Sequence, residues 1–321
     1  MPTLDSFPYS FLVLVAVSFG LLFGSFLNVV IYRLPRGESL AVPGSRCPFC
    51  ATPIRAWNNV PVLSWALLRG RAPCCRARIS LRYPLVELLG AAFAWAILNV
   101  VVLGMPPSTP WWHSAAVFFL YLGMALGLLA ASWIDFEHMI LPDPITIGGT
   151  LLGLATAPLR PHVGLMDGLL GASIGFAMIW LPFIVLYGLV RGHPGMGLGD
   201  AKLTMLAGAW FGWPGAVFAL CVGAVQGTLL TLIVLLVRGR IDEPEAVKRE
   251  RAALRAELEA ADPEERARLE SIVAGDPLAA EPGEGLGQVR IPFGPFLALA
   301  IVEYLLVGEP FVKAYLAWTA W

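Results

Sequence analysis

The sequence predicts an all-α polytopic membrane protein with about eight transmembrane helices. Of the 321 residues, 57% are apolar and only 14% are charged, and the mean hydropathy of +0.71 lies above the range of soluble globular proteins. Charge-poor windows of about 20 residues recur along the chain, and such a window can cross about 30 Å of hydrocarbon as a helix. The windows are 10–31, 84–103, 112–134, 144–159, 165–190, 201–212, 214–237 and 292–308.

The arginines predict the orientation of these helices. Residues 33–82 hold nine arginines and one acid, Glu38, whereas the loops 104–111 and 160–164 hold a single charged residue, Arg160. Because loops rich in Lys and Arg remain in the cytoplasm, we expect residues 33–82 there and, with an even number of spans, both termini outside. No basic region precedes the first window and no convincing cleavage site follows it, so we expect a retained helix.

Two polar inserts divide the apolar chain. The insert 238–291 is rich in Ala, Glu, Arg and Leu, which predicts two short amphipathic helices with Asp262 as the N-cap of the second, followed by a flexible linker. This hairpin is either a solvated excursion or a docking site for a partner. We therefore expect transmembrane helix 1 in 1–32, a cytoplasmic zinc-ribbon-like domain in 33–83, a transmembrane catalytic core in 84–237, a cytoplasmic charged helical insert in 238–291, and the last transmembrane helix with a C-terminal tail in 292–321.

Four cysteines of the first insert suggest a metal site. The stretches "RCPFC" (46–50) and "APCCRARIS" (72–80) contain Cys47, Cys50, Cys74 and Cys75, a pattern close to a zinc ribbon in which four thiolates hold a structural zinc ion. A cytoplasmic location disfavours disulfides. A regular second pair would place a cysteine at Ala72, and the adjacency of Cys74 and Cys75 makes joint ligation awkward, so a metal-free module stays an alternative.

Two acids near the membrane boundary have no simple structural role. Asp135 ends an apolar run at the C-terminal end of a helix, where the helix dipole disfavours a negative charge, and Asp200 follows three glycines in "GMGLGDAKL" (195–203). Both acids fall on the cytoplasmic side at similar depth. Three other acids are expected near helix N-termini, where they would cap the helix or interact with its dipole: Asp143, Asp167 and Glu87. Glu303 lies inside the last window, and the sequence gives no reason for its position there.

Two facing carboxyl groups would share one proton, so that one acts as a base and the other as an acid on a water molecule. This is the chemistry of aspartic proteases, and it needs no metal. Cation or proton transport through the same acids, and a structural ion pair such as Asp135 with Lys202, are the alternatives.

Several neighbours are candidate supporting residues. Gly197 and Gly199, with Gly195, give the backbone room for a substrate or for the helix of Asp135. Lys202 either changes the proton affinity of Asp200 or extends its charged end to the lipid headgroups. The spacing of Gly171 with Gly175, and of Gly223 with Gly227, predicts close helix contacts.

Five blocks of the sequence, in order, resemble the type IV prepilin peptidases, the GxGD aspartyl proteases also called prepilin leader peptidase and N-methyltransferase. The blocks are "GSFLNVVIYRLP" (24–35), "ISLRYPLVELLGA" (79–91) after the cysteine module, "IDFEHMILPD" (134–143), "GMGLGDAKLTMLAGAWFGW" (195–213) and "IPFGPFLALA" (291–300). The resemblance implies that Asp135 and Asp200 are the two catalytic aspartates. Residues 238–290 lie outside it.

The resemblance also implies a function. Such enzymes remove the positively charged leader of type IV prepilins and of pseudopilins of type II secretion, after a glycine at the cytoplasmic face of the inner membrane. Many then methylate the new N-terminus with S-adenosylmethionine. The implied partners are prepilin or pseudopilin N-terminal segments, membrane lipids and the pilus or secretion machinery, and we expect no nucleic-acid partner.

The resemblance does not decide whether this chain methylates its product. Methylation in the family depends on the cytoplasmic region, and in this chain Ala72 breaks the cysteine pattern of that region. No Gly-rich dinucleotide-type fingerprint marks an independent S-adenosylmethionine site. A transporter, and a scaffold for pilus or secretion assembly, are the competing classes.

Overall fold

The computed structural model describes residues 3–42, 44–47, 49–160, 163–238, 244–273, 291–308 and 310–311. Within these residues the chain is helical apart from its loops, and its extended pairings are three isolated bridges. The α-helices are α1 (Tyr9–Arg33), α2 (Leu63–Leu67), α3 (Arg82–Ile97), α4 (Trp111–His138), α5 (Asp143–Ala155), α6 (Leu165–Ile179), α7 (Tyr187–Arg191), α8 (Leu198–Arg238), α9 (Glu245–Ala260), α10 (Pro263–Val273) and α11 (Gly294–Glu303). Short 3₁₀ helices are η1 (Leu4–Ser6), η2 (Leu34–Arg36), η3 (Ala56–Asn58) and η5 (Ala157–Leu159), and π-helices are η4 (Leu98–Val102), η6 (Trp180–Leu186) and η8 (Tyr304–Gly308).

Five helices of the described residues are long and apolar enough to cross a membrane, which confirms the all-α polytopic class. They are Tyr9–Arg36, Arg82–Val102, Trp111–His138, Leu165–Arg191 and Leu198–Arg238. Gly294–Gly308 is a shorter apolar helix, and α5 has 13 residues. The number of eight crossings and the five domain boundaries stay predictions. Most of the predicted linker, and the tail from residue 312, lie outside the described residues.

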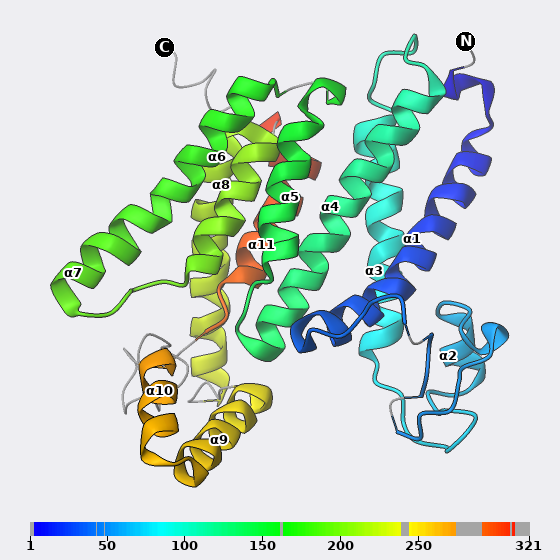
Figure 1. Cartoon of the computed structure of the whole chain (residues 1–321). Coiled ribbons are helices and arrows are strands. Elements are labelled where there is room, and N and C mark those ends of the chain that lie inside the picture. Colours follow the sequence, from blue (N-terminus) through cyan, green and yellow to red (C-terminus); the bar gives the residue numbers. More distant parts are fainter. Residues whose placement is uncertain are drawn as a thin grey trace.

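The helices form one bundle with its polar segments gathered at one end (Figure 1). α4 contacts α1 and α3 on one side and α5 and α11 on the other, and α8 packs against α5, α6 and α11. The cysteine segment with α2, and the α9–α10 hairpin, lie at the same end of the bundle, opposite the beginning of α1 (Figure 1). We call this end the domain end. α9 contacts α4 there.

Glycines let the membrane helices approach closely, as their spacing predicts. Gly171 and Gly175 of α6 lie against the backbone of α8, and Gly223 and Gly227 of α8 lie against α11. A Cβ atom at any of these four positions would approach atoms of the neighbouring helix closely. Helices in lipid associate through such close contacts, because the surrounding hydrocarbon supplies no hydrophobic force between them.

α8 folds back on itself at Gly212, where φ is 70° and ψ is −175°. A Cβ atom at Gly175 of α6 would meet both Thr204 and Ala216 of α8. In a straight helix these two residues would stand about 18 Å apart, so the halves of α8 lie side by side. Glycine adopts a positive φ at little cost, and the two predicted windows 201–212 and 214–237 are these two halves.

Arg160 supports the bend in α8. Pro214 has no N–H group, so the carbonyl of Trp210, four residues earlier, lacks its helical donor. Arg160 is 6% exposed and donates hydrogen bonds to the carbonyls of Trp210, Ala209 and Gly153. Its guanidinium also lies 4.7 Å from the centroid of the Trp210 ring. Backbone groups exposed by the bend are thereby satisfied inside the protein, as a membrane protein requires.

Other acids at helix ends have varied roles. Asp262 caps α10 as predicted, since its carboxylate accepts hydrogen bonds from two N–H groups of the first turn. The capping role for Asp167 is wrong, because α6 has no side-chain cap. Glu87 does not serve its own helix end: it is buried and accepts a hydrogen bond from a loop N–H of the cysteine segment. Glu303 accepts a hydrogen bond from Gln226 of α8.

Replacing Arg160 with Met should lower the free energy of unfolding by about 2–4 kcal/mol, because buried carbonyls at the bend lose their donors. Reversible unfolding in detergent micelles measures this. Arg191→Met is the matched control, since Arg191 is exposed. Equal stability of the two variants would contradict the role of Arg160.

Candidate active site

Asp135 lies at the end of α4, and a different helix binds its carboxylate. The side chain is buried, with the residue 5% exposed. Its Oδ2 accepts a hydrogen bond of 3.0 Å from the backbone N–H of Gly294, the first residue of α11. The first turn of a helix has free N–H groups and a partial positive charge. Asp135 is therefore at the unfavourable end of its own helix, as predicted, but at the favourable end of α11.

Asp200 lies in the first turn of α8 and is half-buried. Gly199, the residue before it, lies against Leu141, and so does Gly294, which donates the hydrogen bond to Asp135, so the two predicted acids come from α4 and α8 to the same turn. The backbone of Asp200 is held by local hydrogen bonds: its N–H donates to the carbonyl of Gly197 at 3.2 Å. The hydroxyl of Thr204 donates to the Asp200 carbonyl at 3.1 Å. The catalytic role of the two acids stays a prediction.

Leu141, in the turn between α4 and α5, packs between the helices that hold the acids. A Cβ atom at Gly199 would lie 2.9 Å from the Cβ of Leu141. A Cβ atom at Gly294 would lie 2.7 Å from the Asp135 Oδ2 and 3.0 Å from Leu141. Any side chain at either glycine would displace Leu141 or Asp135, so bare backbone at both positions is what allows α8 and α11 to reach the turn.

The other two glycines of the loop differ from Gly199. A Cβ atom at Gly197 would lie 3.5 Å from the Asp200 Oδ2, an ordinary contact distance, and one at Gly195 would lie 3.1 Å from the ring of Tyr187. Gly195 therefore packs on the preceding helix, whereas a Cβ atom at Gly197 would contact the Asp200 carboxylate without displacing it. The predicted close backbone approach to the α4 end applies to Gly199.

Lys202 pairs with Asp143 and not with Asp135. The Lys202 Nζ lies 2.6 Å from the Asp143 Oδ1, which joins the start of α8 to the start of α5. The structural pair of Asp135 with Lys202 was therefore wrong. The capping role of Asp143 was wrong as well, because Pro142 occupies the N-cap position of α5 and no side chain caps it.

Two further pairs hold the end of α4. The Glu137 carboxylate lies 2.8 Å from the Arg82 guanidinium of α3. The His138 Nδ1 lies 3.2 Å from the Glu250 Oε1 of α9. Together with the Lys202 pair, these contacts bind three helices, α3, α8 and α9, to the stretch 137–143 that follows Asp135. The pair with α9 indicates that the helical insert docks on the protein itself.

This arrangement can perform acid–base chemistry. The two carboxyl groups come from separate helices that meet at Leu141, where α4 has ended and α8 and α11 begin. Such a pair can remove a proton from a bound water molecule and supply a proton to a leaving group. Sequence reasoning missed Gly294 and Leu141, although a Gly-Pro pair opening an apolar helix at 294–295 is a local signal for a crowded helix start.

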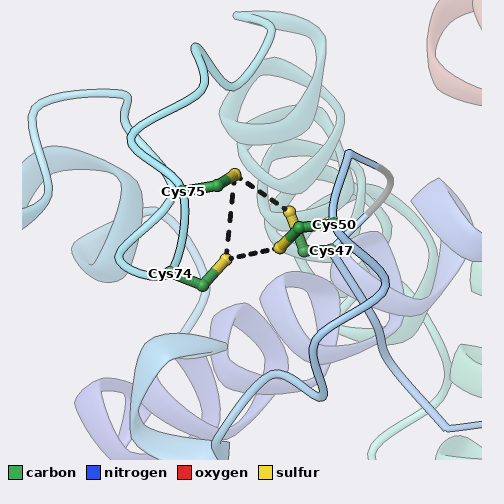
Figure 2. A group of neighbouring side chains, drawn as sticks. All are labelled: Cys47, Cys50, Cys74 and Cys75. Carbon is green, nitrogen blue, oxygen red and sulfur yellow. Dashed lines mark hydrogen bonds between the residues drawn. The ribbon is translucent and has the colours of Figure 1, made fainter.

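The four predicted cysteines form one cluster (Figure 2). All four Sγ atoms lie within 4.8 Å of one another, and those of Cys47 and Cys75, Cys50 and Cys74, and Cys74 and Cys75 are 3.7, 3.3 and 3.9 Å apart. Four thiolates around zinc at about 2.3 Å stand about 3.8 Å from one another. The geometry fits a tetrahedral metal site, and the adjacency of Cys74 and Cys75 does not prevent it.

The two cysteine loops have the same backbone form. In the first, the N–H of Ala51 bonds the carbonyl of Cys47, and in the second the N–H of Arg76 bonds the carbonyl of Ala72. Ala51 and Arg76 have φ values of 55° and 59°. Ala72 in the second loop is therefore equivalent to Cys47 in the first loop. Because Ala72 has no sulfur, Cys74 supplies the fourth thiol of the cluster.

The electrostatics of the cluster prepare one sulfur for metal. Hydrogen bonding with Thr52 lowers the pKa of the Cys50 thiol to about 6, which favours the thiolate, the form that binds metals. The hydrogen bond with Cys50 raises the pKa of Cys74 to about 12.

Two family profiles match the chain. The bacterial peptidase A24 N-terminal domain matches residues 18–101, and the type IV leader peptidase family matches residues 122–232. A prepilin leader peptidase/N-methyltransferase of Stutzerimonas stutzeri is 34% identical over 340 residues, which cover 98% of this chain and 96% of the relative. This chain belongs to the prepilin leader peptidase/N-methyltransferase family.

Other members of the prepilin leader peptidase/N-methyltransferase family are similar to this chain over most of its length. The protein of that name from Pseudomonas aeruginosa is 33% identical over 98% of both chains. The one from Pseudomonas putida is 38% identical over 71% of this chain and 83% of its own length. No solved structure matches the chain. Asp135 and Asp200 both lie in the segment that matches the type IV leader peptidase family, whereas the α9–α10 hairpin lies outside both profiles.

A double-mutant cycle on Lys202 and Asp143 should show a coupling of about 1 kcal/mol in unfolding free energy, because the pair joins two helices at short range. The variants are Lys202→Gln, Asp143→Asn and both together. Lys248 and Glu245, an exposed pair three residues apart on α9, are the control, with an expected coupling of about 0.3 kcal/mol. Equal couplings would show that the Lys202 pair does not join the helices.

Proposed function

We propose that this protein is an intramembrane aspartyl endopeptidase that removes the leader of type IV prepilins and pseudopilins, after a glycine, at the cytoplasmic face of the inner membrane. The observation that supports this most strongly is that the end of α4 with Asp135, the start of α8 with Asp200 and the start of α11 with Gly294 meet at Leu141 in a bundle of apolar helices. Membership of the prepilin leader peptidase/N-methyltransferase family supplies the substrate class.

The proposed orientation places the domain end in the cytoplasm and both termini outside. The nine arginines of residues 33–82 support it, because such loops remain on the cytoplasmic side. A prepilin with its leader in the cytoplasm and its apolar helix in the bilayer then presents its scissile bond at the depth of the two acids.

In the proposed reaction, Asp135 and Asp200 are the catalytic residues and hold one water molecule. One carboxylate takes a proton from the water as its oxygen attacks the peptide carbonyl, and the other carboxyl group gives its proton to the leaving nitrogen as the C–N bond breaks. The products are the leader carboxylate and the free amine of the mature pilin. Gly294 holds the orientation of Asp135 through its N–H group. The step needs no metal.

We assign supporting roles to the neighbours of the acids. Gly199 allows α8 to reach Leu141, and Gly197 lies beside the Asp200 carboxylate. Lys202 fixes the start of α8 against α5 through Asp143. Each of these contacts sets the position of Asp200 relative to the end of α4.

We further propose that Cys47, Cys50, Cys74 and Cys75 hold a structural zinc ion. The fit rests on the sulfur separations and on a donor set of four thiols, which zinc prefers. The ion would close the two loops of the cysteine segment on each other. This segment has few helical turns of its own, so such a crosslink would stabilise it.

N-methylation of the new N-terminus is part of the proposal, since the relatives' name includes it. S-adenosylmethionine would then supply the methyl group. No residues are assigned to its binding: the described residues contain no strand followed by a Gly-rich turn and a helix, so no step of the transfer is derived.

The competing functions have less support. The transporter alternative gains nothing from the family comparisons, which match leader peptidases. A scaffold would not require two acids to meet beside bare backbone. The proposed partners are prepilin or pseudopilin N-terminal segments, membrane lipids and the pilus or type II secretion machinery. The proposed divisions are the transmembrane catalytic core, 84–237, the cysteine domain, 33–83, and the helical insert, 238–291.

The purified protein in lipid should shorten a synthetic prepilin by the mass of its leader, and with S-adenosylmethionine the product should gain one methyl group. Asp135→Asn and Asp200→Asn should each lower the cleavage rate at least about 10³-fold, because each removes one proton-transfer group. Asp167→Asn, on α6, is the control. Wild-type protein that cuts no prepilin, or Asn variants that cut as fast as Asp167→Asn, would exclude the peptidase mechanism. Mass spectrometry gives both readouts.

Gly294→Ala should lower kcat roughly tenfold to a hundredfold, because the new Cβ would lie 2.7 Å from the Asp135 Oδ2 and displace it. Gly123→Ala on α4 is the matched control, since a Cβ atom there meets nothing within 4 Å. Cleavage rates of the two variants, measured on folded protein, decide this. Unchanged activity in Gly294→Ala would show that the position of Asp135 does not matter.

Cys74→Ser should release the zinc that wild-type protein carries at about one ion per chain, because a site with three thiolates binds less tightly. Cys221→Ser is the control, as Cys221 is a free cysteine outside the cluster. Adding Ala72→Cys to Cys74→Ser should restore zinc, since Ala72 has the backbone position of Cys47. Metal content by mass spectrometry is the readout, and full zinc in Cys74→Ser would contradict the assignment.

A further inference from the structure

Residues Trp180–Arg191, which we call the arm, form a helical segment that leaves the bundle. Ile179, just before it, is completely buried, whereas no residue of the arm is buried. Leu189 and Val190 are 80% and 82% exposed. In Figure 1, α7 stands apart from the half of α8 that runs to the domain end. Membrane helices pack through close side-chain and backbone contacts, and the arm makes few of them.

The arm and the loop after it are one unit. Trp180–Leu186 is a π-helix that contains Pro182, and the wide turn leaves the carbonyl of Phe183 free to accept a hydrogen bond of 2.7 Å from the N–H of Gly195. Gly195 also lies against the ring of Tyr187. Single π-turns inside helices occur frequently at functional sites. The unit begins after Ile179 and ends at Gly197, next to Asp200.

We propose that the arm is the docking surface for the apolar helix of the substrate. This rests on the proposed function and adds the place where the substrate helix binds. Apart from Arg191 at its end, the exposed side chains of the arm are apolar or aromatic, and the arm belongs to the candidate membrane span Leu165–Arg191. The occupant that fits it is therefore an apolar helix in the bilayer.

The position of the arm determines where such a helix would end. Its twelve helical residues cover at most about 18 Å, which is a little over half of the hydrocarbon thickness. The arm ends at Arg191, and the loop stapled to its Phe183 carbonyl leads directly to Asp200. On this proposal a substrate helix lying along the arm ends where the loop 192–197 leads back to the start of α8, so that the peptide bond that follows can extend along this loop toward Asp200.

Photocrosslinking tests the surface. p-Benzoylphenylalanine replaces Leu189 or Val190 in the Asp200→Asn protein, which retains uncut substrate, in nanodiscs of phosphatidylethanolamine and phosphatidylglycerol. Leu88 of α3, 51% exposed, is the control site. A synthetic prepilin should be captured at Leu189 and Val190 and not at Leu88. Capture of lipid or of a second copy alone, or equal capture at all three sites, overturns the proposal.

Kinetics test the same surface without a crosslink. The double variant Leu189→Asn, Val190→Asn should raise KM for the full prepilin about fivefold, as lost helix contacts in a membrane predict. It should leave kcat/KM unchanged for a short peptide that spans the cleavage site but lacks the apolar helix. Leu88→Asn is the control. An unchanged KM for the prepilin, or equal losses on both substrates, refutes the docking surface while cleavage by wild-type protein upholds the peptidase. A wild type that cuts neither substrate refutes the peptidase itself.

Discussion

The hydrogen bond from Gly294 to Asp135 is the contact on which the site depends. A carboxylate within a bundle of membrane helices is costly unless fixed polar groups bind it, and here the first N–H group of α11 does so. This bond requires bare backbone at Gly294, because a Cβ atom there would meet both Asp135 and Leu141. Leu141 in turn requires bare backbone at Gly199. The position of one carboxylate thus determines how α11, the α4–α5 turn and the start of α8 meet, and with it the position of Asp200.

Polar side-chain pairs around this contact connect the separate parts of the chain. Arg82 with Glu137 joins the segment that matches the N-terminal domain profile to the segment that matches the peptidase profile. His138 with Glu250 joins the latter to α9, which lies outside both profiles. Both polar inserts are therefore attached to the end of the helix that carries Asp135. Apolar helices form the bundle, but it is polar contacts at its domain end that fix the geometry of the acids.

Much of this could be predicted from local sequence, and the remainder could not. Hydropathy predicts the membrane helices because each needs a long apolar run, and the two windows on either side of Gly212 correspond to the two halves of α8. Asp135 was identified because it opposes the dipole of its own helix. The partners of these residues were not predictable: Gly294 is remote from Asp135 in sequence, and Lys202 binds Asp143 across two helices. Likewise, spacing suggested a defective cysteine motif, whereas the loop backbone brings Cys74 into the place of a missing sulfur.

The most direct test of the account is the separation of the Asp135 and Asp200 carboxyl groups in an experimental structure of the protein in lipid. The account predicts both groups at one membrane depth, with a single water molecule within about 2.6–3.2 Å of each, and the Gly294 N–H on Asp135. Carboxyl groups at opposite membrane faces, or too far apart to bind one water molecule together, would contradict it.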